Sequence, residues 1–494
     1  MTVSDRAARP STALLLLTAL LLIALALVTP VNHDEDQYVA AAALVARGLR
    51  PFADFIYLQT PLQPWLTGPV AALAPGWSFV ALRLVNALAG AATLGFVFAA
   101  QRRAGVRARD AGLATLLCGS CVAFLFCASV ARNDALPGLL LAIALWAGAR
   151  GRSVDWLIAG VALGLAASLK ISFGVPLALG GAWLVWRFVR APSRGGAAAV
   201  VAWGLGGAAG LVPTALTWAA YPHAFTYGVF TYAAEGARIW YDLNGIGDRL
   251  SFAAKLRDTA VALAMGPALL VLAVVATRRR SPALPYAGFV DALLMAGFVA
   301  ALLPTPTYRQ YLLPLLPPLF VRLGLAADGW RDARWMRRAL IAWGTAAALI
   351  YAGIGVRDAL RHGGPAPLRL IAQAHWLGAQ VRAAGLTGPV ATFSPSYVVG
   401  SGVPLDPRFA TGVHVWRSGD LRGDAELAAF HAVSRRTLAA ELDRLPPAAI
   451  LTGFEGASGV NRRIVPDAAL DAWARSRGYR AVRGEAGGVL WLRK

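Results

Sequence analysis

Apolar runs of about 20 residues recur along this sequence, and they constrain its fold more than any other feature. A helix of about 20 apolar residues crosses about 30 Å of hydrocarbon. Only 15% of the residues are charged and 57% are hydrophobic, whereas soluble proteins have about 25% and 45–50%. The first run, Leu14–Val28, is not followed by a signal-peptidase pattern, so we expect it to stay as a span. The pattern predicts eleven spans, at residues 12–30, 79–100, 111–130, 134–149, 154–169, 172–189, 197–221, 258–277, 283–303, 311–327 and 338–356.

The positive charges alternate between the loops, which predicts the orientation. The formal net charge of +21 is typical of nucleic-acid-binding proteins, but here arginines fill every second loop, as the positive-inside rule requires. We therefore predict membrane lipids rather than nucleic acid as the partner. The short intervening loops hold few cations: Arg132, Lys170 and Arg309. The predicted cytoplasmic arginines are Arg6, Arg9, Arg102, Arg103, Arg107, Arg109, Arg150, Arg152, Arg187, Arg190, Arg194, Arg278, Arg279, Arg280, Arg331, Arg334, Arg337 and Arg338.

Three segments on the opposite side are long, and an odd number of spans places the C-terminus there too. Segment 31–78 has apolar residues at helical spacing, segment 222–257 is aromatic and polar, and segment 357–494 is more charged. In the last segment, β-like runs at 389–393 and 448–451 alternate with a helical run at 427–445. We predict an all-α transmembrane domain, residues 1–356, and a small α/β domain, residues 357–494, on the periplasmic side of a bacterial inner membrane.

Several short motifs carry no cofactor prediction. Cys118 and Cys121 form a C-x-x-C, but no further Cys or His nearby completes a zinc shell. The glycines of residues 204–210 loosely match a dinucleotide fingerprint, yet they lie inside a predicted span with no strand before them. Gly206 and Gly210 suit close helix packing instead. We expect no bound metal, although the requirement for a divalent cation stays open.

Ionisable residues collect at the predicted outward ends of the spans. Asp34, Glu35 and Asp36 follow the first span directly, and acids also favour helix N-termini, so a capping role is one reading. Each Arg or Lys side chain at these span ends, taken singly, could equally extend its charged group to the membrane interface. Together, Asp34, Glu35, Asp134, Arg83, Arg132, Lys170 and Arg309 favour one site, where the cations hold a phosphate and a carboxylate deprotonates an acceptor.

The order of these motifs resembles a known group of membrane enzymes. Residues 34–38 (DEDQY) resemble the D-E-x-x-Y motif of GT-C glycosyltransferases, which include the dolichyl-phosphate-mannose–protein mannosyltransferases and the bacterial aminoarabinose and galacturonic acid transferases. Residues 48–51 with Asp54, residues 60–65 (TPLQPW) and the Arg83 segment 81–90 resemble further elements of that group. Asp134, Lys170 and the segment 308–318 also fall at the expected places, so the resemblance covers about residues 12–356.

This resemblance implies an inverting transfer of a sugar from a polyprenyl-phosphate donor to a lipid, glycan or protein acceptor. Asp34 matches the acid that activates the acceptor hydroxyl, Glu35 is the reserve candidate, and Asp134 matches a second acid that orients the acceptor. The donor phosphate is expected to contact Lys170, Arg309, Arg83 and Tyr308, and the substrates to contact Tyr38, Arg132 and Gln59. Aminoarabinose transferases have an acidic–lysine pair where this chain has Gln59 and Thr60, which favours an acceptor other than lipid A phosphate.

Two other functions remain open from the sequence. A transporter or flippase for lipid-linked sugars would also use outward cations, but it predicts inverted repeats or broken helices, and no internal repeat is evident. A catalytically inactive relative would use its tail to bind a partner. The loop at 402–420 contains Asp406, Arg408, His414 and Trp416, which could face the site, but ordinary domain surface is the favoured reading.

Overall fold

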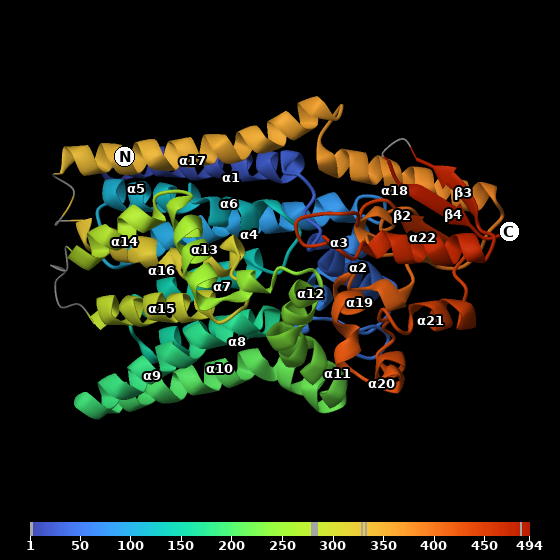
Figure 1. The fold of residues 1–494 in the computed structure, drawn as a ribbon. Helices are drawn as coiled ribbons and strands as arrows, with labels where there is room; N and C mark the ends of the chain where they lie inside the picture. The colour runs from blue at the N-terminus through green and yellow to red at the C-terminus, as the bar shows by residue number, and fades with distance from the viewer. Residues whose placement is uncertain (1–2, 278–284, 328–329, 331–332, 485–486) are drawn as a thin grey trace. The chain divides into compact units, whose positions relative to one another are not determined.

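The computed structural model describes residues 3–277, 285–327, 330, 333–484 and 487–494, and Figure 1 shows the elements along the chain. The start of the predicted span 283–303 and the predicted cytoplasmic Arg278, Arg279, Arg280 and Arg331 lie outside these residues. Two compact units divide the chain. The helical unit comprises Met1–Thr29, Leu84–Pro213 and Lys255–Arg357, and the mixed unit comprises Pro30–Arg83, Thr214–Ala254 and Asp358–Lys494.

Apolar helices build the helical unit, and some of them continue into the mixed unit. All eleven ranges predicted as spans hold a helix or a helix pair. Four described helices are long and apolar enough to cross a membrane, or six if each of two bent pairs is one span, so the number eleven stays a prediction. The helices are α1 (Val3–Val28), α4 (Ser78–Arg103), α5 (Ala108–Gly119), α6 (Val122–Ser129), α7 (Ala135–Gly148), α8 (Ser153–Leu169), α9 (Gly174–Arg190), α10 (Arg194–Ala220), α13 (Phe252–Ala264), α14 (Ala268–Thr277), α15 (Pro285–Leu302), α16 (Leu316–Leu325) and α17 (Arg334–Arg361).

Two of the predicted spans are not straight helices. The pair α5–α6 bends by 69° and the pair α13–α14 bends by 95°. Gly266 lies between α13 and α14 with φ of +123°, which only glycine adopts without strain, and Pro267 follows it. The two breaks meet, because the Val122 backbone N–H donates to the Met265 carbonyl over 3.0 Å. A backbone group freed by one break is thereby satisfied by the other.

Glycines bring α8 and α10 into backbone contact. A Cβ atom at Gly160 would lie 2.5 Å from the Trp203 carbonyl oxygen, and one at Gly164 would lie 2.5 Å from that of Gly207. From the other side, a Cβ at Gly206 would meet the Leu157 carbonyl oxygen. A Cβ at Gly210 would likewise lie 2.5 Å from the Val161 carbonyl oxygen, so the expectation that Gly206 and Gly210 serve close helix packing is confirmed.

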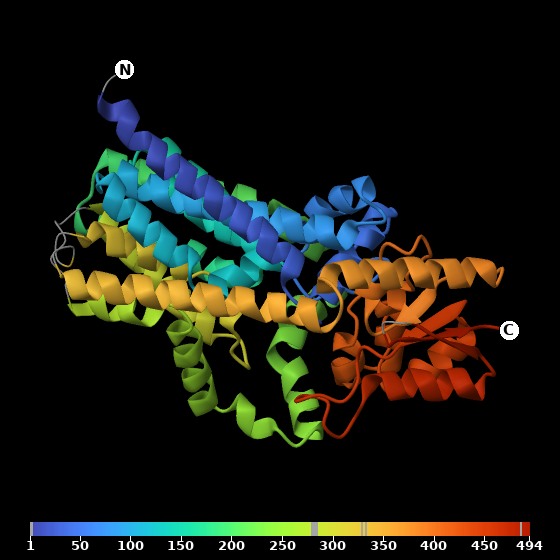
Figure 2. The ribbon, with the colours of Figure 1, turned by 90° about the horizontal axis from the view of Figure 1, so that it is seen from above.

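The mixed unit combines short helices with a four-stranded sheet (Figures 1 and 2). The sheet order is β1-β2-β4-β3; β1 pairs parallel with β2, and the other two pairs are antiparallel. Leu377 and Val381 of α18 pack with Ala449, Leu490 and Leu492 of the sheet. The elements are α2 (Glu35–Ala46), α3 (Leu62–Leu73), α11 (Pro222–Thr226), the π-helix η2 (Tyr227–Gly236), α12 (Ala237–Leu243), α18 (Ala366–Ala383), β1 (Val390–Thr392), η6 (Pro395–Tyr397), α19 (His414–Ser418), α20 (Asp424–Ala429), α21 (Leu438–Arg444), β2 (Ala449–Thr452), α22 (Pro466–Ser476), β3 (Arg480–Arg483) and β4 (Val489–Leu492).

The tail therefore has the predicted α/β character, with one correction. The β-like runs at 389–393 and 448–451 correspond to β1 and β2. The predicted helix 427–445 is wrong as a single element, because the chain turns between α20 and α21. His431 has φ of 51° in this turn, and the Ser434 backbone N–H donates to Thr437 Oγ1 over 2.9 Å, so local polar bonds replace the helical ladder. The domain boundary at residue 356 stays a prediction.

Candidate functional site

The acidic run after α1 opens α2, but capping does not explain Asp34. Asp34 occupies the position before the helix, and its side chain makes no capping hydrogen bond. Glu35 instead reaches back, since Glu35 Oε2 accepts the Asn32 backbone N–H over 2.9 Å. The Asp34 side chain is 22% exposed.

The neighbouring Glu35 is committed to a buried ion pair. Arg83 donates through Nε to Glu35 Oε1 over 2.8 Å and through NH2 to Oε2 over 2.6 Å. Both side chains have no exposed surface. Arg83 also donates to the Pro30 carbonyl over 3.1 Å and lies over the Phe79 ring. Arg83 and Glu35 thus satisfy each other's charge in this structure. The expected contact of Arg83 with a donor phosphate and the reserve role of Glu35 as a base stay predictions.

Asp36 is buried in a third environment. Its Oδ1 accepts the Ser396 backbone N–H over 3.0 Å, which joins the start of α2 to η6. Burial raises the pKa of Asp36 to about 8 from its ordinary value of 3.8, although the bond from Ser396 opposes the rise. Three adjacent carboxyls therefore differ: Asp36 is buried and favours the neutral form, Glu35 is paired with Arg83, and Asp34 is partly exposed.

Two histidines contact the Asp34 carboxylate. Nε2 of His33 lies 3.1 Å from Asp34 Oδ1, and Nε2 of His414 lies 3.5 Å from the same oxygen. Asp34 raises the pKa of His33 by charge attraction and by a hydrogen bond, against the effect of burial. On its other nitrogen, His414 Nδ1 lies 3.2 Å from the Tyr232 hydroxyl of η2. Three separate segments of the mixed unit thus converge on this carboxylate.

A second cluster lies in the helical unit, where α7, α8 and the loop before α7 meet. Asp134 Oδ2 accepts from Arg132 Nε over 3.0 Å, and Asp134 Oδ1 pairs with Lys170 Nζ. Asn86 on α4 fixes the loop, because its amide donates to the carbonyls of Val130 and Arg132. Asp134 is 1% exposed and holds two cations beside it. Its expected role in orienting the acceptor stays a prediction.

Arg309 joins this cluster and gives it excess positive charge. Its guanidinium lies 4.1 Å from the centroid of the Phe126 ring, and the Lys170 ammonium lies 5.1 Å from that of Tyr311. The Arg132 guanidinium lies 5.9 Å from the centroid of the same Phe126 ring. One carboxylate therefore faces three cations, and such a site favours an anion. Tyr308 lies next to Arg309 and is 43% exposed.

Tyr38 and Gln59, both expected to contact substrate, lie in the mixed unit with different exposure. Tyr38 is 2% exposed within an apolar cluster, and its ring stands edge-on to Tyr57 at 6.5 Å. The hydroxyl of Tyr57 donates to Gln63 Oε1 over 2.7 Å. Tyr38 thus packs in the core of the mixed unit, whereas Gln59 is half-buried. The expected substrate contacts of both residues stay predictions.

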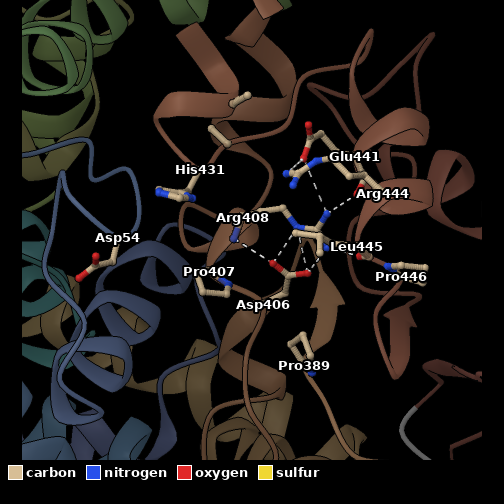
Figure 3. A pocket seen from close by; sticks show the side chains of 12 residues that line it. Asp54, Pro389, Asp406, Pro407, Arg408, His431, Glu441, Arg444, Leu445 and Pro446 are labelled. Carbon is tan, nitrogen blue, oxygen red and sulfur yellow. Dashed lines mark hydrogen bonds and ion pairs between the residues drawn. The ribbon is translucent and has the colours of Figure 1, made fainter. Parts of the chain in front are cut away.

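The loop at 402–420 contains structural residues and one site residue. Arg408 donates to both oxygens of Asp406 and to the carbonyls of Glu441 and Leu445, and these residues line the cavity in Figure 3, of about 480 Å³. Trp416 is 3% exposed in the core. His414, by contrast, contacts Asp34, although the sequence analysis favoured ordinary domain surface for His414. The sequence analysis gave His33 no role, although the position of His33 directly before the acidic run was a signal.

Within the described ranges, no group of three or more His, Cys, Asp or Glu side chains is arranged to hold a metal ion.

Comparisons with known proteins find likeness in structure alone. No protein-family model and no curated protein sequence matches the chain. The crystal structure of ArnT from Cupriavidus metallidurans bound to undecaprenyl phosphate is similar over 97% of each chain, with 16% identity and a TM-score of 0.62. The Archaeoglobus fulgidus oligosaccharyltransferase in complex with Zn and sulfate is similar over 97% of this chain and 73% of that one, with 13% identity and a TM-score of 0.53.

A third similar structure is the arabinofuranosyltransferase AftD from Mycobacteria, which matches 98% of this chain and 40% of its own length at 15% identity and a TM-score of 0.50. Together with the apolar helices of the helical unit, the likeness shows that this chain is a multi-pass membrane protein with the GT-C glycosyltransferase fold.

Proposed function

We propose that this protein is an inverting glycosyltransferase that acts at the periplasmic face of a bacterial inner membrane. It moves a sugar from a polyprenyl-phosphate donor to a hydroxyl group of a lipid, glycan or protein acceptor. The observation that carries the proposal is Asp34, a partly exposed carboxylate that makes no helix-capping hydrogen bond and follows the first helix of a GT-C fold.

Asp34 is the proposed general base. It accepts the proton of the acceptor hydroxyl while the acceptor oxygen attacks the anomeric carbon of the donor sugar. The bond from that carbon to the phosphate oxygen breaks, and the polyprenyl phosphate leaves with the electron pair. Attack opposite to the leaving group inverts the anomeric configuration. His33 and His414 hold the carboxylate in place from two sides.

Lys170, Arg309 and Arg132 are the proposed groups for the donor phosphate. Leaving of the polyprenyl phosphate increases negative charge on its oxygens, and fixed cations stabilise that charge without reorganising. Asp134 holds two of the three cations in place. Tyr308, next to Arg309, and the half-buried Gln59 are secondary candidates for substrate contacts. We assign Arg83 and Glu35 to positioning the acidic loop, because their charges satisfy each other within the protein.

Transport of a lipid-linked sugar is the second candidate, and one observation favours it. Broken helices are common in secondary transporters, and the bent pairs α5–α6 and α13–α14 are of this kind. These breaks are closed by a backbone hydrogen bond between Val122 and Met265, and no internal repeat accompanies them in the sequence. Glycosyl transfer therefore remains the better-supported function.

The test is transfer by purified protein in lipid nanodiscs. A polyprenyl-phosphate sugar with a radiolabelled sugar is supplied with membrane extract of a strain lacking the gene, as the acceptor source. Asp34→Asn is expected to reduce transfer at least about 10²-fold, the size of a general-base contribution. Asp54→Asn is the matched control, because Asp54 pairs with Arg50 at the surface. Full activity of Asp34→Asn in a folded protein would refute the assignment of the base.

A further inference from the structure

A cavity of about 470 Å³ opens in the mixed unit beside the acidic loop, on the side that carries Pro30. Ligand sites in proteins range over about 300–1,000 Å³ and combine apolar walls with a few polar groups. This cavity is lined by Pro30 and Val31 before α2, by Asp358 and His362 at the end of α17, by Arg369 of α18, and by Tyr397 and Phe454. None of the residues assigned above to the reaction lines it.

The aromatic wall is a stacked pair. The rings of Tyr397 and Phe454 lie 3.8 Å apart with an angle of 14° between them, and both are half-buried. Stacking covers one face of each ring, so the edges and outer faces remain for other neighbours. Among the described residues, none hydrogen-bonds the Tyr397 hydroxyl. Burial raises the pKa of Tyr397, so the hydroxyl stays protonated and can donate.

The polar wall is electrically balanced. Arg369 NH2 donates to Asp358 Oδ2 over 2.9 Å and Arg369 NH1 to the Gly364 carbonyl over 2.9 Å. The ring of His362 lies 3.1 Å from Asp358 Oδ1. An anionic ligand would have to compete with Asp358 for the Arg369 guanidinium and would be repelled by the Asp358 carboxylate. An uncharged ligand with several hydroxyl groups could instead accept from Arg369 and donate to Asp358 without displacing either.

We propose that this cavity binds an uncharged saccharide unit, through the Tyr397–Phe454 pair and the polar group of Asp358, His362 and Arg369. Apolar faces of a sugar ring pack on aromatic rings, and its hydroxyls match the donors and acceptors of the opposite wall. The wall at Pro30 lies in the segment that carries Asp34, and η6 binds Asp36 through Ser396. If the proposed function holds, the saccharide belongs to the acceptor or to a glycan product.

The experiment measures binding directly, without transfer. Saturation-transfer difference NMR is recorded on the full protein in nanodiscs with methyl α-D-mannopyranoside, methyl β-D-galactopyranoside and maltose, and phosphorus NMR with inorganic phosphate. At least one saccharide is expected to bind. Tyr397→Phe keeps the stack and should weaken its binding about three- to tenfold, as the loss of one neutral hydrogen bond does. Phe454→Leu should weaken it by at least as much.

Leu445→Ala, in the cavity of Figure 3, is the matched control and should bind saccharide as the wild type does. The proposal is overturned if no saccharide binds, if phosphate binds more tightly than all three, or if folded Tyr397→Phe and Phe454→Leu proteins bind like the wild type. Asp34→Asn separates the two proposals, because it should abolish transfer and leave saccharide binding unchanged. Failure of that variant to abolish transfer affects only the assignment of the base.

Discussion

Glu35→Ala tests whether the buried ion pair with Arg83 holds the acidic loop in place. Removing one partner of a buried ion pair costs about 3–5 kcal/mol, because a buried charge is left without compensation. Two contacts of Arg83 survive the change, the bond to the Pro30 carbonyl and the Phe79 ring. The expected loss is therefore near the lower end, about 3 kcal/mol, a large share of the typical stability of about 5–15 kcal/mol.

The assay is equilibrium unfolding in mixed micelles of mild detergent and SDS, followed by tryptophan fluorescence. The double variant Glu35→Leu with Arg83→Met is the control, because apolar replacement of a whole buried pair is often neutral or stabilising. In this double variant the Pro30 carbonyl loses its donor and the part-buried Asn32 backbone N–H loses its acceptor. The stability of the double variant should therefore lie within about 2 kcal/mol of the wild type. The reasoning is refuted if Glu35→Ala unfolds like the wild type, or if Arg83→Met raises KM for the donor with unchanged stability, since Arg83 would then contact the donor phosphate.

Three further predictions concern separate parts of the molecule. The pKa of Asp36 is raised in the folded state, so the contribution of Asp36 to stability is complete below about pH 4 and is lost as the pH rises to about 8. In Asp36→Asn, the free energy of unfolding should therefore depend less on pH across that range. Gly206→Ala should cost about 1–3 kcal/mol by overpacking α8 against α10, whereas Gly204→Ala, with open space around its Cβ, should be neutral or slightly stabilising in the same assay. His414→Ala should lower kcat about ten- to a hundredfold with little change in donor KM, because it misplaces the base; an unchanged kcat would limit His414 to structure.

The sequence predicted the helices well, because apolar runs and breakers are local signals. Each predicted span coincides with a helix or a helix pair, and the close packing at Gly206 followed from the spacing of glycines. The break between α13 and α14 was missed although Gly266 and Pro267 mark it. A run of apolar residues indicates burial in lipid. It does not indicate that a second broken helix supplies a hydrogen-bond partner, as Val122 does for the Met265 carbonyl.

The site was predicted less completely, because its decisive contacts join distant positions. Arg83 lies 48 residues from Glu35, and Ser396 lies 360 residues from Asp36. Nothing in DEDQY itself shows that Glu35 pairs with Arg83, that Asp36 is buried against η6 and that Asp34 is partly exposed. The choice of Asp34 as the candidate base followed from resemblance and stays a prediction. His414 could not be assigned, since one histidine in a loop has no partner within the local sequence.

The most direct test of glycosyl transfer is the fate of the donor lipid in nanodiscs with purified protein. A polyprenyl-phosphate sugar labelled on both the lipid and the sugar is incubated with acceptor, and free polyprenyl phosphate and glycosylated product are counted separately. The proposed function predicts one polyprenyl phosphate released for each sugar transferred, with inverted anomeric configuration, and neither product with Asp34→Asn. The same labelled donor is also supplied to the protein in liposomes. Intact donor that crosses the liposome bilayer, with no polyprenyl phosphate released, would contradict the proposed function and identify a transporter.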